Sequence, residues 1–417
     1  MKESWRVCYI RLAFLSTVAK EKAGKTGIDV LLSCGEASGE LYAAELVREL
    51  RAIDPEARCF GIGGHRLEQA GAEILVDLHT ISVIGLVEVL SKLPALKRAQ
   101  TTLLAAASRR MPDVAVLIDF SGFNLRLSSR LKALGVPVVY YVSPQVWAWR
   151  RGRLRTIGRN VDKMLVILPF EESFYGDAGI AAKFVGHPLV DLVRSHQDRP
   201  TFFRRLGLRA DRPLVVLMPG SRPREIELHL PVIAGAMRKM MARRSDLQFA
   251  LIKAPTVEEP AIRAGLGDAS ASVSVLSESA YEALSHADVA IVASGTATVE
   301  AALSETPMVV VYRVGGLSYR LGRPFVRVPH FAMVNLIAGR ALVPELIQDE
   351  MTEERVASET LRLLEDPEAA ESMRRGLREV KARLGAGGAS RRAAEEVLSV
   401  ARDGRGVQRP RHEVLAT

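Results

Sequence analysis

The stretch VAVLIDFSGFNLRLSSRLKALGVPVVYYVSPQVWAWRR, residues 114–151, decides the fold of this chain. Its first five residues are apolar, as expected for a parallel strand covered on both faces, and the run stops at Asp119. Residues 125–134 carry apolar side chains at helical spacing, and residues 136–142 form a second apolar run that ends at Ser143. The stretch therefore predicts a strand, a helix and a second strand of one parallel sheet.

The carboxyl ends of these two strands define the predicted active site. Ligands of open parallel sheets bind outside the carboxyl ends of the strands. Asp119 and the loop 143–149 follow the two strands directly, so we expect both to line one crevice. A carboxylate in such a crevice can take a proton from a reacting group.

The composition indicates a large globular protein with a basic surface. A hydrophobic content of 48% over 417 residues is enough for two separate cores. The net charge of +9 favours anionic partners, such as phosphorylated substrates, phospholipid surfaces or nucleic acid. We expect no nucleic-acid partner, because the chain contains no motif of that class. Its three cysteines lack metal-ligand spacing and predict neither a zinc site nor a disulfide framework, which fits the reducing cytoplasm.

The chain divides into two halves that repeat the same alternation of strands and helices, with Pro200 and Pro213 in a polar linker between them. An apolar patch near the start is interrupted by Arg11 and is too short to span a bilayer. The predicted segments are a dispensable extension (1–25), a first Rossmann-like domain (26–192), a second Rossmann-like domain (193–385), and a helix with a basic tail that packs back on the first domain (386–417).

Two strand-to-helix turns in the second half contain residues suited to phosphate. In the first, Gly220 and Ser221 allow close approach to the backbone, and Arg222 offers a planar charged fork for phosphate oxygens. The second is SGT at 294–296, where the helix N-terminus favours a diphosphate. Glu300, one turn into that helix, can accept hydrogen bonds from two ribose hydroxyls. Ordinary capped helices are the alternative interpretation.

Two features of the first half allow a functional or a purely structural interpretation. The turn CGEASGE at 34–40 joins a strand to a helix through small residues, which suits either a ligand or a simple helix start. Residues 81–103 are more apolar than one buried stripe requires and include Lys97 and Arg98. This segment predicts either core helices or a face that touches lipid or an acyl chain.

Several ordered runs extend from residue 28 to residue 392. They are CGEASGE (34–40), IDFSGFN (118–124), YYVSPQVWAW (140–149), VGHPLVD (185–191), PGSRPREIE (219–227), SGTATVEAAL (294–303) and NLIAGRALVPELIQ (335–348). As a set they resemble the lipid-A-disaccharide synthase family of glycosyltransferases. The resemblance implies the GT-B arrangement, an α/β fold in which two Rossmann-like domains with parallel sheets face each other across a cleft.

The resemblance also implies a reaction. A member of the family is an inverting hexosyltransferase that transfers 2,3-diacylglucosamine from UDP-2,3-diacylglucosamine to the 6-hydroxyl of 2,3-diacylglucosamine 1-phosphate (lipid X). The products are UDP and the β-1,6-linked disaccharide 1-phosphate of lipid A (lipopolysaccharide) biosynthesis. The resemblance implies no cofactor and no obligatory metal. It implies a cytoplasmic enzyme held peripherally on the anionic inner face of the bacterial inner membrane, and it leaves a homodimer open.

The resemblance assigns roles to individual residues. Asp119 matches the general base for the acceptor hydroxyl, and with an ordinary pKa we expect it to act late, as the C–O bond forms. Arg222 and the turn 294–296 would stabilise charge on the departing diphosphate. The implied catalytic residues are Asp119, Arg222 and Glu36. The implied substrate-binding residues are Ser38 and Asn124 in the first half, and Gly220, Ser221, Ser294, Gly295, Thr296, Glu300, Asn335 and Gln348 in the second.

The chain departs from the family pattern after Asp119, where Ser121 and Gly122 replace a proline and, often, an acidic residue. Other functions also fit parts of the sequence. A UDP-sugar 2-epimerase shares the two-domain arrangement but needs no acyl-sized apolar surface. A glycosyltransferase with a different acceptor fits as well. A non-catalytic lipid-surface binding protein would have no need for Asp119, Arg222 and Glu300 together.

Overall fold

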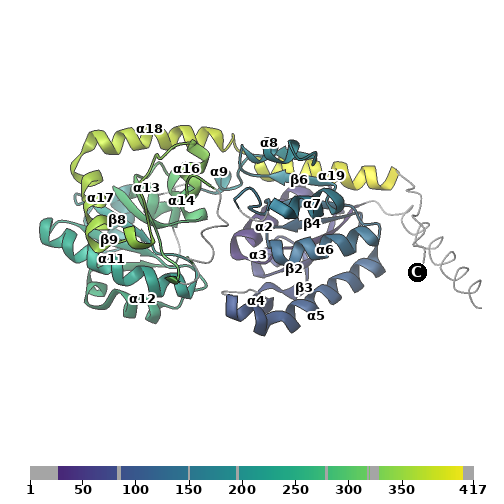
Figure 1. Cartoon of the computed structure of the whole chain (residues 1–417), viewed down its shortest axis with the longest axis horizontal. Coiled ribbons are helices and arrows are strands. Elements are labelled where there is room, and N and C mark those ends of the chain that lie inside the picture. Colours follow the sequence, from purple (N-terminus) through teal and green to yellow (C-terminus); the bar gives the residue numbers. More distant parts are fainter. Residues whose placement is uncertain are drawn as a thin grey trace, which may run out of the picture.

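The computed structural model describes residues 27–81, 86–148, 151–193, 197–277, 280–316, 319 and 328–406. Two α/β domains lie next to each other along the long axis of the molecule (Figure 1). The predicted extension 1–25, Trp149 of the loop 143–149 and the tail 407–417 lie outside the described residues.

The first sheet contains seven strands, all parallel, in the order β3-β2-β1-β4-β5-β6-β7. The strands are β1 (Asp29–Ser33), β2 (Arg58–Gly63), β3 (Glu73–Asp77), β4 (Val114–Ile118), β5 (Val138–Tyr141), β6 (Lys163–Val166) and β7 (Ala182–Phe184). The strand order reverses between β1 and β4, and such a switch point is where ligands of open parallel sheets bind. Asp119 follows β4 and Glu36 lies shortly after β1, so both lie at this point.

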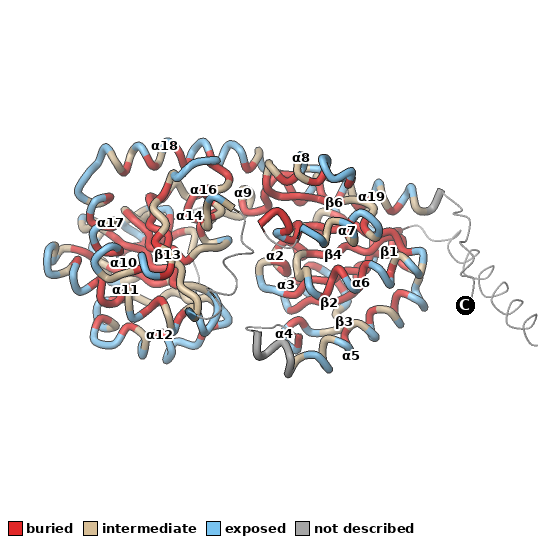
Figure 2. Tube along the Cα trace, in the orientation of Figure 1, coloured by how far each residue is buried: buried red, intermediate tan, exposed pale blue. Residues whose placement is uncertain are grey.

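Helices cover both faces of this sheet. They are α2 (Ala37–Ile53), α3 (His65–Gln69), α4 (Leu78–Ile81), α5 (Leu86–Arg110), α6 (Ser121–Ala133), α7 (Leu154–Asn160), α8 (Glu171–Gly176), α9 (Leu189–Leu192) and, from the end of the chain, α19 (Ala389–Gly406). Along β4, Val116 packs in the core that includes α2 and α19, whereas Leu117 packs in the core that includes α5 and α6. The strands are therefore buried on both faces, as the apolar runs predict (Figure 2).

The second sheet contains six parallel strands in the order β10-β9-β8-β11-β12-β13. The strands are β8 (Leu214–Met218), β9 (Gln248–Ile252), β10 (Val273–Leu276), β11 (Val289–Ala293), β12 (Met308–Tyr312) and β13 (Glu345–Ile347). Its helices are α10 (Arg199–Arg205), α11 (Pro223–Arg243), α12 (Glu259–Leu266), α13 (Ala280–His286), α14 (Thr296–Leu303), α16 (Met333–Ala338), α17 (Glu353–Glu365) and α18 (Pro367–Arg383). The order reverses between β8 and β11, and the two predicted phosphate turns follow these strands. The predicted class of two parallel α/β domains is confirmed.

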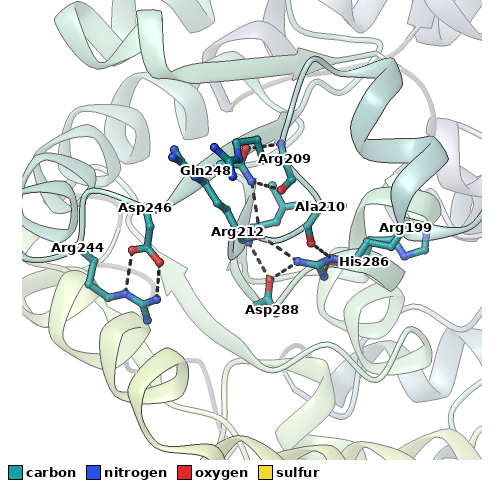
Figure 3. Close-up of polar contacts among 10 residues, drawn as sticks. Arg199, Arg209, Ala210, Arg212, Arg244, Asp246, Gln248, His286 and Asp288 are labelled. Atoms are coloured by element: carbon teal, nitrogen blue, oxygen red, sulfur yellow. Dashed lines mark hydrogen bonds and ion pairs between the residues drawn. The ribbon is translucent and has the colours of Figure 1, made fainter.

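Helix α10 ties the interdomain linker to the amino edge of the second sheet. Arg199 opens this helix, and its guanidinium donates to the carbonyl oxygens of Ala210 and His286 at 3.1 and 2.6 Å (Figure 3). It also donates to the carboxylate of Asp288 at 3.0 Å. A planar fork can satisfy several acceptors at once, so one side chain fixes where the second domain begins.

Aspartates at the amino edges of both sheets join neighbouring strands. Each lies one residue before a strand, and its carboxylate accepts the N–H of the first residue of the neighbouring strand. The pairs are Asp113 with Asp29 at 2.9 Å, Asp162 with Val138 at 2.9 Å, and Asp288 with Leu214 at 2.8 Å. The sequence analysis did not identify this repeated contact.

The end of the chain returns to the first domain. Figure 1 shows α18 running along the second domain and α19 lying against the first. Helix α19 contacts α2, β4 and β5. Glu396 on α19 forms ion pairs with Lys163 of β6 and Lys183 of β7. The first sheet is therefore covered on one face by the last described helix.

The apolar segment 81–103 lies largely within α5, which contains Pro94. Residues 82–85 and the side chains of residues 86–91 lie outside the description, and Leu93 is 43% exposed. Lipid contact by this segment stays a prediction. Across the described ranges, no helix combines the length and the apolar character needed to cross a membrane.

Candidate active site

Asp119 lies in a strained turn between β4 and α6. Its backbone is left-handed, with φ of 46°, and so is that of Phe120, with φ of 47°. Residues with a Cβ atom rarely adopt this conformation, and two in succession are held only where surrounding contacts require them. The turn leads directly into α6, which begins at Ser121 rather than at the predicted residue 125.

The environment of Asp119 changes its acid-base chemistry. Burial raises the pKa of its carboxyl to about 7, and the negative charge of Glu36 raises it as well. A hydrogen bond from the N–H of Phe120 and the charge of Arg222 lower it, without offsetting the burial. The expectation of an ordinary pKa is therefore wrong, because the fold removes this carboxyl from water. A carboxylate with a pKa near 7 is a stronger general base than an ordinary one.

Asn124 contacts Asp119 through the backbone. Its amide nitrogen donates to the carbonyl oxygen of Asp119 at 2.9 Å, and its oxygen accepts the hydroxyl of Ser33 at 2.7 Å. The side chain is completely buried. The predicted substrate-binding residue Asn124 therefore hydrogen-bonds to the backbone of the turn that carries Asp119.

Arg222 lies between carboxylates of the two domains. Its Nη2 is 3.6 Å from Oε1 of Glu36 at the start of α2, and its Nη1 is 3.7 Å from Oε1 of Glu225 in α11. Arg222 and Glu36 are 49% and 51% exposed, so an anionic ligand can reach them. All three predicted catalytic residues are thus brought together at the junction of the domains. Ser38, in the first turn of α2, is partly buried beside Glu36.

The first predicted phosphate turn, at residues 220–222, binds the carboxylate of Glu225. The N–H groups of Ser221 and Arg222 donate to Oε2 of Glu225 at 3.0 and 3.3 Å. Gly220 has φ of 130°, and a Cβ atom there would lie 2.6 Å from the same oxygen. The turn therefore has the geometry of an anion site. Glu225 was not predicted from the sequence, although a glutamate at the third helical position is a capping-box signal.

His229 connects this turn to the strand next to β11. Burial lowers the pKa of its imidazole, so the ring is neutral and needs one donor and one acceptor partner. Nδ1 lies 2.6 Å from the carbonyl oxygen of Pro219, and Nε2 accepts the N–H of Arg313 at 2.9 Å. His229 thereby fixes the start of the turn against the end of β12, and the sequence analysis missed it.

The second phosphate turn opens α14. Gly295 precedes the helix with φ of 149°, and the hydroxyl of Ser294 donates to the carbonyl oxygen of Phe331 at 2.9 Å. Thr296 is the exposed first residue of the helix. The first N–H groups of a helix have no partner within it and are available to a ligand. The turn therefore can bind an anion, as the small residues predict.

Glu300 lies one turn further along α14 and is partly buried. Burial raises the pKa of its carboxyl to about 7. In the part of the chain that the structure describes, no donor is hydrogen-bonded to this carboxyl. Its charge raises the pKa of the phenol of Tyr42 on α2, so Glu300 also lies close to the first domain.

The amides of Asn335 and Gln348 are occupied by the backbone. Asn335 is fully buried and bonds to residues 342, 343 and 345 through both its oxygen and its nitrogen. The amide of Gln348 pairs with the N–H and the carbonyl oxygen of Val314 at 2.8 and 3.2 Å. Asn335 and Gln348 were expected to line the donor side. Their place on the donor side stays a prediction, and in the structure their amides bond to residues 342, 343 and 345 and to Val314.

Glu345 connects Asn335 to the second phosphate turn. Its carboxylate accepts the side chain of Asn335 at 2.7 Å and the N–H of Phe331 at 2.9 Å. Phe331 is the residue whose carbonyl accepts the hydroxyl of Ser294. Within the described ranges, no group of three or more His, Cys, Asp or Glu side chains is arranged to hold a metal ion.

Sequence relatives cover almost the whole chain. Lipid-A-disaccharide synthase from Myxococcus xanthus is 47% identical over 376 residues, which are 90% of this chain and 98% of that protein. The synthase from Geobacter sulfurreducens is 43% identical over 371 residues, which are 89% of this chain and 97% of that protein.

Solved structures share the fold at much lower identity. UDP-GlcNAc 2-epimerase from Neisseria meningitidis, bound to UDP-GlcNAc, superposes with a TM-score of 0.62 at 12% identity, over 89% of this chain and 100% of that chain. The calicheamicin glycosyltransferase superposes with a TM-score of 0.54 at 18% identity, over 90% and 99% of the two chains. These likenesses concern the fold alone. The sequence model of lipid-A-disaccharide synthetase matches residues 30–398, and the chain therefore belongs to the lipid-A-disaccharide synthetase family.

Proposed function

We propose that this hexosyltransferase joins UDP-2,3-diacylglucosamine and 2,3-diacylglucosamine 1-phosphate into the β-1,6-linked disaccharide 1-phosphate and UDP. The observation that carries the proposal is the meeting of Asp119 and Arg222 at the domain junction. One is a carboxyl with a pKa of about 7, and the other is an accessible guanidinium. Family membership supplies the substrates, and this pairing supplies a base for the acceptor and a cation for the leaving group.

The second domain is proposed to bind the UDP part of the donor. The exposed guanidinium of Arg222 is the group of the first turn that meets the diphosphate, while the N–H groups of Ser221 and Arg222 stay bonded to Glu225 and hold the turn in place. The turn 294–296 offers helix N-terminal N–H groups to the same diphosphate. Glu300 accepts the ribose hydroxyls, for which its carboxyl is open. The solved relative with UDP-GlcNAc bound has the same two-domain fold.

The proposed chemistry is a single displacement. Asp119 takes the proton of the acceptor 6-hydroxyl while the oxygen bonds to the anomeric carbon. The bond from that carbon to the diphosphate oxygen breaks, and UDP leaves with the electron pair. Attack from the face opposite UDP inverts the anomeric carbon. Arg222 and the dipole of α14 stabilise the charge that develops on UDP. Glu36 keeps the pKa of Asp119 high and pairs with Arg222 between turnovers.

We further propose that the enzyme works on the anionic inner face of the membrane. The net charge of +9 favours such a surface, and both substrates carry acyl chains that a bilayer holds. Sedimentation with anionic vesicles should be strong at low salt and should fall as salt rises. Binding that is absent or insensitive to salt would contradict a peripheral electrostatic attachment.

The epimerase alternative is not favoured. Epimerases among the solved structures share 12% to 16% identity with this chain, a level that reports the fold alone. Curated relatives at 42% to 47% identity over about 90% of the chain are named as synthases. A decayed binding protein would also gain nothing from a base and a cation held together at the junction.

The deciding experiment measures release of UDP from UDP-2,3-diacylglucosamine with and without 2,3-diacylglucosamine 1-phosphate. We expect release only with the acceptor, together with a disaccharide product of the matching mass. Asp119→Asn should slow the formation of both by orders of magnitude, since an amide cannot take the proton. Release of UDP without acceptor, or proton exchange at C2 of UDP-GlcNAc, would contradict the proposal.

A further inference from the structure

We propose that Tyr140 is a positioning residue for Asp119, and that its buried hydroxyl holds the left-handed turn from which the Asp119 carboxyl projects. Tyr140 lies on β5, directly opposite Leu117 of β4 in the parallel ladder. Its side chain is completely buried and does not reach the acceptor. The inference rests on the proposed function, because Tyr140 is assigned a role that acts through the base.

The carbonyl oxygen of Asp119 accepts two hydrogen bonds, which use both of its lone pairs. The hydroxyl of Tyr140 donates at 2.5 Å, and the amide nitrogen of Asn124 donates at 2.9 Å. The N–H of Asp119 donates to the carbonyl oxygen of Tyr141 at 3.2 Å. The peptide groups around Asp119 are thus held from α6 and from the neighbouring strand.

A turn of this kind needs such support. Asp119 and Phe120 are both left-handed, and neither is a glycine. Without these hydrogen bonds, Asp119 and Phe120 would relax to common backbone angles, and the carboxyl of Asp119 would move. Tyr140 and Asn124 oppose this movement at the residue that carries the carboxyl.

The ring of Phe120 packs against Phe123 and Gly35 next to the turn. It stacks on Phe123 with ring centres 5.1 Å apart. A Cβ atom on Gly35 would lie 2.2 Å from the Phe120 ring, so only glycine allows the ring to lie there. Residues of three signature runs, at 34–40, 118–124 and 140–149, therefore build one support for the Asp119 turn.

Charged and titratable groups from every neighbouring element act on Asp119. They are Glu36 just before α2, Tyr42 on α2, Arg222 at the start of α11 and Tyr140 on β5. Arg153, whose charge acts on Tyr140, donates to the hydroxyl of Ser121 at 3.0 Å. Burial is the largest of the effects that raise the pKa of Asp119. A turn that relaxes toward water therefore lowers this pKa.

Tyr140→Phe tests the inference, because it removes one hydroxyl and keeps the ring. Tyr141→Phe is the matched control, since this neighbour is equally buried but packs in the core on the opposite face of the sheet. We expect Tyr140→Phe to lower kcat by about 10- to 100-fold, because small misplacements of catalytic groups have effects of this size. KM for both substrates should change less than about threefold. The acid limb of the kcat profile should move to lower pH.

The control separates positioning from general loss of packing. Tyr141→Phe should keep the wild-type kcat and pH profile even where its melting temperature falls. Wild-type kinetics in Tyr140→Phe, or equal losses in both variants, would overturn the inference. Should Tyr140→Phe not fold, Gly35→Ala displaces the Phe120 ring instead, and the same loss of kcat and shift of the acid limb are expected.

One measurement is independent of turnover. The carboxyl carbon of Asp119 can be followed by NMR titration and assigned by its absence in Asp119→Asn. Its pKa should fall in Tyr140→Phe and not in Tyr141→Phe, and an unchanged pKa would overturn the inference. Absence of acceptor-dependent UDP release by the wild type would count against the proposed function alone, because this titration still reports on the turn.

Discussion

The two edges of the sheets use carboxyl groups in opposite ways. At the amino edges, the carboxylates of Asp113, Asp162 and Asp288 accept N–H groups of neighbouring strands. At the carboxyl edges, burial raises the pKa of Asp119 and Glu300 to about 7. The same chemical group stabilises the fold where the chain supplies a donor. Where burial outweighs the donors that the chain supplies, the charged form of the group is destabilised and the group becomes reactive.

The two ends of β4 give the largest expected contrast. Asp119→Asn should lower kcat by about 10²- to 10⁴-fold, because the general base is lost, and should not lower the stability of the fold, because it removes a carboxyl whose charged form burial disfavours. Asp113→Ala should keep the wild-type kcat and lower the free energy of unfolding by about 1–3 kcal/mol, because a buried N–H loses its acceptor. Urea unfolding and steady-state kinetics on both variants check this. A large loss of stability in Asp119→Asn would break the comparison.

The amino edge of the second sheet gives an intermediate effect. Arg199→Lys should destabilise the protein by about 1–3 kcal/mol, because a lysine cannot reproduce the bonds of the guanidinium to Ala210, His286 and Asp288. Arg204→Lys, on the exposed side of the same helix, is the control and should change stability by less than about 0.5 kcal/mol. Chemical denaturation measures the free energy of unfolding of both variants. Equal losses would show that the hydrogen bonds of the Arg199 guanidinium do not stabilise the protein.

The pH dependence of stability tests the comparison through the two raised pKa values. Asp119 and Glu300 have folded-state pKa values of about 7, above the ordinary values of about 4 that apply in the unfolded chain. Their contribution to stability is therefore fully present below about pH 4 and is lost as pH rises through 7. The double variant Asp119→Asn with Glu300→Gln should lose less stability than the wild type between pH 5 and pH 8. Urea unfolding at each pH measures this stability. If the stability of the two proteins changes with pH to the same extent, the raised pKa values are contradicted.

The strands were predictable because burial on both faces leaves a continuous apolar run. The strand predicted for the first five residues of the stretch 114–151 has these bounds in the structure, as Val114–Ile118. Helix α6 differs, since it begins at Ser121 and not at residue 125. Apolar spacing cannot show a left-handed turn, because the turn depends on donors that reach Asp119 from elsewhere in the chain.

The site was predictable where a single turn carries the signal. The small residues near Gly220 and Gly295 indicate tight turns between a strand and a helix, and the structure has such turns there. That these turns bind an anion stays a prediction. The pKa of Asp119, the carboxylate of Glu225 inside the first turn and the occupied amide of Asn335 were not predictable. Each depends on tertiary packing, which no local pattern in the sequence encodes.

Helix α19 has a consequence for how this protein is made. The helix covers the α2 side of the first sheet, yet the whole second domain lies between β7 and α19 in the chain. A ribosome releases the first domain long before it releases α19. The part of this face that α2 leaves open therefore stays uncovered until synthesis ends, and the two domains cannot mature strictly one after the other.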